Sequence, residues 1–180
     1  MKSYLTHLEC TACGETYSAD EPHRTCPSCG KVLYARYDLD SLAREVTRAD
    51  LASRPPSMWR YFEVLPVRGE ENVVSLGEGM TPLVHAKRLG NELGCPRLFI
   101  KDEGGNPTGS FKARGISAAV SKAKELGQMR LTMPSAGNAA GALASYCAQA
   151  GMEAHVFMPI DAPAANRKEC RAFGAHLTLV

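Results

Sequence analysis

Short apolar runs alternate with stretches of helical periodicity over the second half of the chain. The expected strands are residues 97–101, 131–133, 154–158 and 176–180. The expected helices are residues 111–126, 138–150 and 164–173. A glycine follows each of these helices, at Gly127, Gly151 and Gly174, in the position where a left-handed residue commonly ends a helix. The alternation predicts an α/β fold with right-handed crossovers and a mostly parallel sheet.

The part of the chain before this unit has a different pattern. Leu39, Leu42 and Val46 share one side of an expected helix over residues 38–51, and the prolines at 55 and 56 prevent its continuation. Three aromatic residues follow within residues 58–62, and they favour packing of this segment on the main region over an interface anchor. We therefore divide the chain into a first module at 1–37, an arm at 38–75 without assigned chemistry, and an α/β region at 76–180.

Composition and charge exclude several classes of protein. The 180 residues are 44% hydrophobic and 22% charged, which is typical of a globular chain with a real core. A net charge of +2 without a concentrated basic run argues against nucleic-acid binding. No stretch approaches the ~18 apolar residues of a membrane helix, and the N-terminus lacks the apolar run of a signal peptide. We expect a cytoplasmic protein with no nucleic-acid or membrane partner.

Four of the seven cysteines form two Cys-x-x-Cys pairs, Cys10 with Cys13 and Cys26 with Cys29, each followed by a glycine. Such a turn brings two thiolates to one side of a loop, and two turns complete a tetrahedral site. The pattern predicts structural Zn²⁺ in a zinc-ribbon-like module, with unligated thiols or a redox pair as alternatives. His23 lies between the pairs and is interpreted as an exposed loop histidine, because four sulfurs already fill the site.

The stretch Asn-Pro-Thr-Gly-Ser-Phe-Lys-Ala-Arg-Gly at 106–115 places Lys112 at the first turn of a helix, behind a turn and a serine able to cap it. Helix amides there attract an anion. A lysine held beside a cofactor phosphate can lose its proton and form an imine with an aldehyde, which is the chemistry of pyridoxal phosphate. A lysine at a helix start is ordinarily a solvated charge, so only the surrounding motif favours the cofactor.

A second loop, residues 134–139, also follows an expected strand and precedes an expected helix. Ligands of parallel sheets bind at the carboxyl ends of the strands, where loops meet helix N-termini. We therefore expect Lys112 and Asn138 to converge on one ligand.

Three motifs carry a resemblance to a known family: Gly-Glu-Gly-Met-Thr-Pro-Leu at 77–83, Asn-Pro-Thr-Gly-Ser-Phe-Lys at 106–112 and Ser-Ala-Gly-Asn-Ala-Ala at 135–140. They resemble the tryptophan-synthase-β-like, fold-type-II pyridoxal phosphate enzymes, and among these the threonine synthases. The resemblance covers residues 76–180. It implies a three-layer αβα fold, pyridoxal 5'-phosphate, a small amino-acid substrate and a homodimer of the full-length protein.

The resemblance also implies roles for individual residues. Lys112 would carry the cofactor and act as general base, Asn138 would face the ring hydroxyl, and Phe111 would stack on the pyridine. The substrate carboxylate would be held by Ser135, Ala136, Gly137, Asn138 and Ala139. The simpler alternatives are a helix N-cap at Asn138, a plain turn at the second loop and a core phenylalanine at 111.

Two features depart from the family pattern. Threonine synthases commonly have Asp where this chain has Ala113, and Phe-Lys-x-Arg-Gly also occurs in serine and threonine dehydratases. No run of three or four glycines occurs in the chain, although the family binds the cofactor phosphate with one. We therefore expect an α/β region that is incomplete at its C-terminus, and an N-terminal part of a longer enzyme that is inactive alone.

Three functions remain open at this point. The first is a threonine synthase-like lyase that converts O-phosphohomoserine and water to threonine and phosphate. The second is a serine or threonine dehydratase, or another β-replacement enzyme. The third, of a different class, is a non-catalytic zinc-ribbon binding protein. His85, His155 and His176 lack partners at ligand spacing, and no role is assigned to them.

Overall fold

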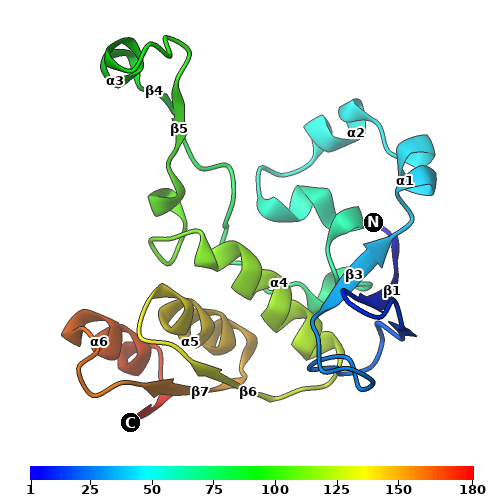
Figure 1. The fold of residues 1–180 in the computed structure, drawn as a ribbon, viewed down its shortest axis with the longest axis vertical. Coiled ribbons are helices and arrows are strands. Elements are labelled where there is room, and N and C mark those ends of the chain that lie inside the picture. The colour runs from blue at the N-terminus through cyan, green and yellow to red at the C-terminus, as the bar shows by residue number, and fades with distance from the viewer.

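The computed structural model describes residues 1–180 throughout, with helices and strands in a mixed α/β arrangement (Figure 1). The strands are β1 (Leu5–Cys10), β2 (Thr16–Tyr17), β3 (Leu33–Tyr37), β4 (Leu83–His85), β5 (Phe99–Lys101), β6 (Arg130–Pro134), β7 (Glu153–Met158) and β8 (His176–Leu179). The α-helices are α1 (Leu39–Glu45), α2 (Arg48–Ser53), α3 (Lys87–Glu92), α4 (Lys112–Glu125), α5 (Asn138–Ala150) and α6 (Ala164–Ala172). The 3₁₀ helices are η1 (Met58–Val64), η2 (Glu70–Asn72) and η3 (Glu103–Gly105). No helix is long and apolar enough to cross a membrane.

The first module is a small antiparallel sheet with the order β2-β1-β3. It is bonded to the arm, because the Tyr4 amide donates to the Glu63 carbonyl and the Asp38 amide donates to the Tyr4 carbonyl. The Arg68 side chain extends this contact by donating to the Leu5 carbonyl. The boundaries after residues 37 and 75 stay predictions.

The single helix expected over 38–51 is wrong, because two short helices occupy this segment. Asp38 caps α1, and Val46 leaves the helix with extended φ and ψ angles. Thr47 and Asp50 then form a capping box that starts α2. Side-chain oxygens that satisfy free helix amides favour a new start over a continued helix at this point.

The aromatic segment packs inside the chain, as expected. Trp59 and Phe62 are buried with Val67 in a small core of the arm. The Trp59 indole also donates to Ser117 of α4, so this core joins the arm to the α/β region.

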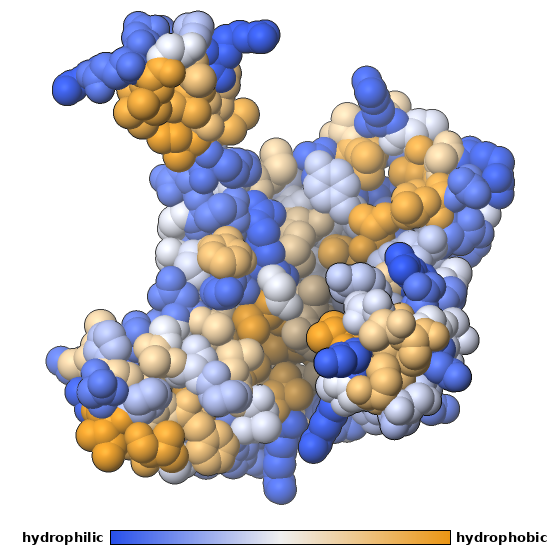
Figure 2. Space-filling model, in the orientation of Figure 1, coloured by the Kyte–Doolittle hydropathy of each residue, from blue (hydrophilic) through white to orange (hydrophobic).

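The strand expected at 97–101 forms as β5, but it does not join the parallel sheet. It pairs with β4 in a separate antiparallel ladder, in which Leu83 lies opposite Lys101. β4, α3 and β5 form an extension away from the body of the protein in Figure 1. Apolar side chains gather on it in Figure 2 and are exposed at Leu83, Val84, Leu89, Leu93, Phe99 and Ile100. This extension is the largest difference from the expected topology.

The remaining elements confirm the α/β prediction. Strands β6, β7 and β8 are parallel neighbours in that order, and α5 and α6 lie on one face of the sheet (Figure 1). Ala154, Val156 and Met158 point from β7 into the core under these helices. Gly127, Gly151 and Gly174 have positive φ angles after α4, α5 and α6, as the glycine pattern predicts.

Helices α4 and α5 pack against each other and begin on the same side of the molecule (Figure 1). Their contact contains Ala113, Ile116 and Val120 from α4 and Leu143 and Tyr146 from α5. This packing brings the first turns of two helices, which carry the predicted site residues, to one side of the fold.

Candidate functional site

Lys112 is the first residue of α4, and its ammonium group is exposed. Its Nζ lies 4.3 Å from the centre of the Phe111 ring, and no carboxylate or hydrogen-bond acceptor contacts it. Phe111 is itself 57% exposed, so it is not the core phenylalanine of the simpler alternative. Lys112 therefore has no ion pair that would have to break before its side chain contacts a ligand.

The turn before Lys112 has the structure that its residue types predict. Asn106 is buried, and its carbonyl accepts from the amide of Gly109, whose φ of +65° suits a residue without a Cβ atom. The Ser110 hydroxyl accepts from the Lys112 amide at 3.3 Å. Phe111 is nevertheless the N-cap residue of α4 and no side chain caps this helix, so the expected serine cap is wrong. The Thr108 hydroxyl oxygen is buried without any partner, so the turn retains an unsatisfied polar group next to Lys112.

The carboxylate of Glu103 holds this turn in place. Arg114 donates to Glu103 through Nε and Nη2 at 2.6 and 2.8 Å, and Thr81 and Asn106 donate to the same carboxylate. These hydrogen bonds, the one from Arg114 first, hold the pKa of Glu103 at about 2. The Gly79 amide donates in turn to Asn106 Oδ1. The segment around residue 80 and the Lys112 turn therefore form one connected structure.

The second loop joins β6 to α5 at the carboxyl end of the parallel sheet, as expected. The Ser135 amide donates to the Phe157 carbonyl of β7, and the Ser135 hydroxyl accepts from the Gly137 amide. Gly137 is the N-cap of α5, so the alternative of an N-cap at Asn138 is wrong. The backbone amides of Ala136, Asn138 and Ala139 donate to no protein acceptor. Three free amides at a helix start suit a carboxylate or phosphate group.

The structural reason that the two loops lie on one side of the fold differs from the one expected. Lys112 does not follow a strand of the parallel sheet, because β5 belongs to the β4-β5 ladder and η3 intervenes. The two loops instead share one side of the fold because α4 packs on α5. The unpaired Lys112 side chain and three free amides fit an anionic aldehyde cofactor. The convergence of Lys112 and Asn138 on one ligand stays a prediction.

Sequence reasoning missed a buried carboxylate beneath both helices. Glu78 is fully buried and accepts from Trp59 Nε1 at 2.9 Å, Ser117 Oγ at 2.5 Å and Tyr146 Oη at 2.6 Å. The Leu76 amide and the Ser75 hydroxyl also donate to it. Burial opposes ionisation, but these hydrogen bonds outweigh it and lower the pKa of Glu78. The hydrogen-bond partners of Glu78 come from distant segments of the chain. Its neighbours Gly77 and Gly79 gave no indication that the side chain is buried.

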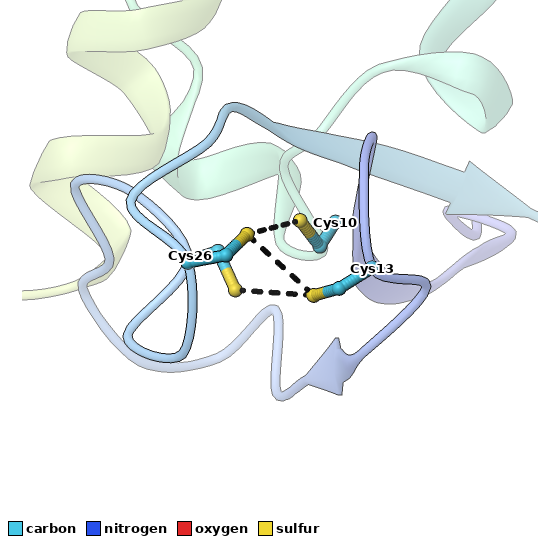
Figure 3. A group of neighbouring side chains, drawn as sticks. Cys10, Cys13 and Cys26 are labelled. Atoms are coloured by element: carbon cyan, nitrogen blue, oxygen red, sulfur yellow. Dashed lines mark hydrogen bonds between the residues drawn. The ribbon is translucent and has the colours of Figure 1, made fainter.

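The four cysteines predicted to bind zinc come together. Their sulfur atoms all lie within 4.8 Å of one another, and Figure 3 shows Cys10, Cys13 and Cys26 directed at a common centre. The Sγ–Sγ distances are 3.4 Å for Cys10 with Cys29, and 3.6 Å for Cys13 with Cys26. Tetrahedral Zn–S bonds of ~2.3 Å require sulfur separations of ~3.8 Å, so this set fits the ion with small adjustments.

Hydrogen bonds favour the thiolate at Cys10 and Cys26 only. At Cys13 and Cys29 a backbone amide lowers the pKa of the thiol, but hydrogen bonds with neighbouring thiols and burial outweigh it and raise that pKa. The Tyr17 hydroxyl, 3.2 Å from Cys26 Sγ, lowers the pKa of that thiol to about 6. Backbone amides, that of Cys13 first, lower the pKa of Cys10. The interpretation of His23 as an exposed residue is wrong, because the ring packs on Tyr17 with its Nε2 buried. His23 is not part of the sulfur cluster.

The absence of partners expected for His155 and His176 is also wrong. The two residues are paired across β7 and β8, and their rings stack with centroids 4.6 Å apart. Glu153 Oε2 lies 3.3 Å from His155 Nε2 and 3.0 Å from Arg130 Nε. Pairing between strands is a long-range property that spacing along the chain does not reveal.

Comparison with known proteins agrees with this geometry. The family model described as "Pyridoxal-phosphate dependent enzyme" matches residues 74–180. The chain therefore belongs to the pyridoxal-phosphate dependent enzyme family, and the prediction of this class of enzyme is confirmed.

Two threonine synthases are similar to most of the chain. Threonine synthase of Methanocaldococcus jannaschii is 43% identical over 150 residues, covering 83% of this chain and 37% of that protein. Threonine synthase of Methanosarcina acetivorans is 42% identical over 155 residues, covering 86% and 37%. The chain thus spans 37% of the length of each of these relatives.

Solved structures share the fold of the α/β region. Maize serine racemase aligns with a TM-score of 0.51 at 29% identity, over 55% of this chain and 30% of that chain. Processed threonine deaminase isoform 2 of Solanum lycopersicum aligns with a TM-score of 0.50 at 30% identity, over 56% and 28%.

Proposed function

We propose that the chain contributes the lysine-bearing part of a threonine synthase-like lyase, which converts O-phosphohomoserine and water to threonine and phosphate. The observation that carries the proposal is 43% identity over 150 residues to a threonine synthase. The unpaired Lys112 at the start of α4 supports it. A cytoplasmic location and a homodimer belong to the same proposal.

The residues of the chain take the following roles in this proposal. Lys112 holds the cofactor and then moves protons at the substrate carbons. The free amides of the 135–139 loop take the α-carboxylate of the substrate, and Asn138 donates to the ring hydroxyl. Phe111, already beside Lys112 Nζ, covers one face of the pyridine. When bound, pyridoxal phosphate withdraws electrons from the substrate α-carbon.

The cofactor assignment is tested by adding pyridoxal phosphate to the chain, reducing with borohydride and locating the label by peptide mass spectrometry. We expect absorbance near ~410 to 430 nm and a label on Lys112. Lys112→Ala should abolish both, whereas Lys87→Ala, a change of an exposed lysine outside the site, should abolish neither. A label that survives Lys112→Ala would refute the assignment. Full-length protein that never takes up the cofactor would favour the non-catalytic zinc-ribbon alternative.

The likeness to threonine deaminase at 30% identity, together with Ala113 after the lysine, favours a dehydratase as the second candidate. Substrate assays on the enzyme separate the two functions. Phosphate release from O-phosphohomoserine supports the synthase, and ketoacid formation from threonine supports the dehydratase.

We further propose that the four cysteines hold one structural Zn²⁺. Four soft thiolates fill a tetrahedral site without an open position, which suits a structural role better than a catalytic one. The four sulfur atoms within 4.8 Å of one another support metal binding. The lowered thiol pKa values of Cys10 and Cys26 favour it at two of the four ligands, because ligands must be deprotonated.

A further inference from the structure

Glu78 is a fully buried carboxylate that forms no ion pair. A buried charge without a cation is costly unless hydrogen bonds replace its water shell. Five donors do so here, and two of them are side chains from the two helices of the candidate site. A carboxylate maintained against this cost, between the helix that begins at Lys112 and the helix that begins at Asn138, indicates more than ordinary core packing.

The two oxygens of Glu78 bind different elements. Oε1 accepts from Trp59 of the arm and Ser117 of α4, and Oε2 accepts from Tyr146 of α5. At ~1.5 Å of rise per residue, Ser117 and Tyr146 lie roughly 8 and 12 Å along their helices from Lys112 and Asn138. One carboxylate therefore connects the first half of α4 to the second half of α5, two helices whose first turns belong to the two loops.

The apolar contact between the helices does not fix their spacing in the same way. Its members include small side chains, such as Ala113 and Ala142, and hydrophobic attraction has no preferred direction. Hydrogen bonds require defined distances and angles, and those to a charged acceptor are the stronger ones. The carboxylate of Glu78 thus fixes the position of α4 along α5, which the apolar contact alone does not determine.

We propose that Glu78 is a positioning residue of the cofactor site: it fixes α4 relative to α5, and so Lys112 relative to the 135–139 loop. The inference rests on the proposed role of Lys112 in holding pyridoxal phosphate. Glu78 itself contacts neither the cofactor nor the substrate. It acts through the hydroxyl groups of Ser117 and Tyr146.

The test compares Glu78→Gln with Glu63→Gln in the 180-residue chain. Glutamine keeps the size of the side chain but turns an NH₂ group toward hydrogen-bond donors. Glu63 is a matched control, because it is also buried and accepts two hydrogen bonds from Arg54, but within the arm. Two readouts are used: pyridoxal phosphate affinity by titration, and amide chemical shifts of residues 135–139 without cofactor.

We expect Glu78→Gln to weaken pyridoxal phosphate binding roughly ten- to hundredfold, the loss of affinity that removal of a supporting partner causes at metal sites. The amides of residues 135–139 should shift as well. Ser117→Ala should shift the same amides from the neighbouring helix, which a local packing role of Ser117 would not do. Glu63→Gln should leave both readouts unchanged.

Folded Glu78→Gln with unaltered affinity and unaltered amide shifts would overturn the inference. If Glu78→Gln does not fold, Ser117→Ala and Tyr146→Phe decide by the same readouts, because each removes a single donor. If the unmodified chain takes up no cofactor, the amide shifts alone decide whether Glu78 sets the position of the loop. The proposed function is then tested separately, by cofactor uptake of the full-length enzyme.

Discussion

Two regions of the molecule each hold a pair of turns in place. In residues 1–37, cysteine side chains bring the two turns together. In the α/β region, the two turns precede helices that pack against each other and bind Glu78. The first region buries few side chains, and two of its buried residues are the cysteines Cys10 and Cys26. The second has two apolar clusters around α5. A small region with few buried side chains gains more from a bound ion than a region with a larger core, which can retain a buried charge.

Removal of the metal should give the largest difference between the two regions. Structural zinc contributes ~10 to 16 kcal/mol to folding in small zinc modules, so we expect a strong chelator to unfold residues 5–37 and to leave residues 112–179 folded. Amide NMR measures both regions at once, and metal analysis should find one zinc per chain.

Cys26→Ser should reproduce the effect of the chelator, while Cys95→Ser, which changes an exposed cysteine outside the cluster, should not. If the first module keeps its amide shifts without metal, the prediction that it depends on the ion while the α/β region does not would be wrong.

A smaller effect is expected at Glu103, which fixes the Lys112 turn. Glu103→Gln should lower the free energy of unfolding at pH 7 by about 1 to 3 kcal/mol, because hydrogen bonds to a charged group are lost. The folded pKa of about 2 lies below the ordinary 4.5, so this stabilisation is complete above about 4.5 and disappears as the pH falls toward 2.

Chemical unfolding at several pH values measures this effect. The two proteins should converge in stability near pH 2, and a constant difference at every pH would contradict the assignment. Glu92→Gln is the control, because the Arg88–Glu92 pair is exposed and such pairs contribute little.

The smallest effect is expected in the arm that joins the two regions. Thr47→Ala removes the capping box of α2 and should lower the free energy of unfolding by ~1 kcal/mol. Thr47→Ser keeps the hydroxyl and should retain the stability. An equal loss in both variants would mean that the methyl group, and not the cap, stabilises the arm.

Local signals predicted much of the fold. The limits of α4 and α5 followed from helical periodicity and from Gly127 and Gly151, because these depend on neighbouring residues. The capping box at Thr47 was also readable in the sequence and could have corrected the single helix expected there.

Features that depend on distant residues were not predictable in this way. The pairing of β5 with β4 and the stacking of His155 on His176 are set by tertiary contacts. The same holds for Glu78, whose partners are up to 68 residues away. The motifs drew attention to Lys112 and to the thiol cluster, but not to the Glu78 carboxylate that is hydrogen-bonded to both helices.

Trp59 is the only tryptophan of the chain, and its indole nitrogen donates to both Glu78 and Ser117. All tryptophan fluorescence of the protein therefore originates beside the buried carboxylate. The emission wavelength reports the polarity of that interior site, without any added probe. Stopped-flow fluorescence can thus follow how fast the arm and the two helices assemble around it.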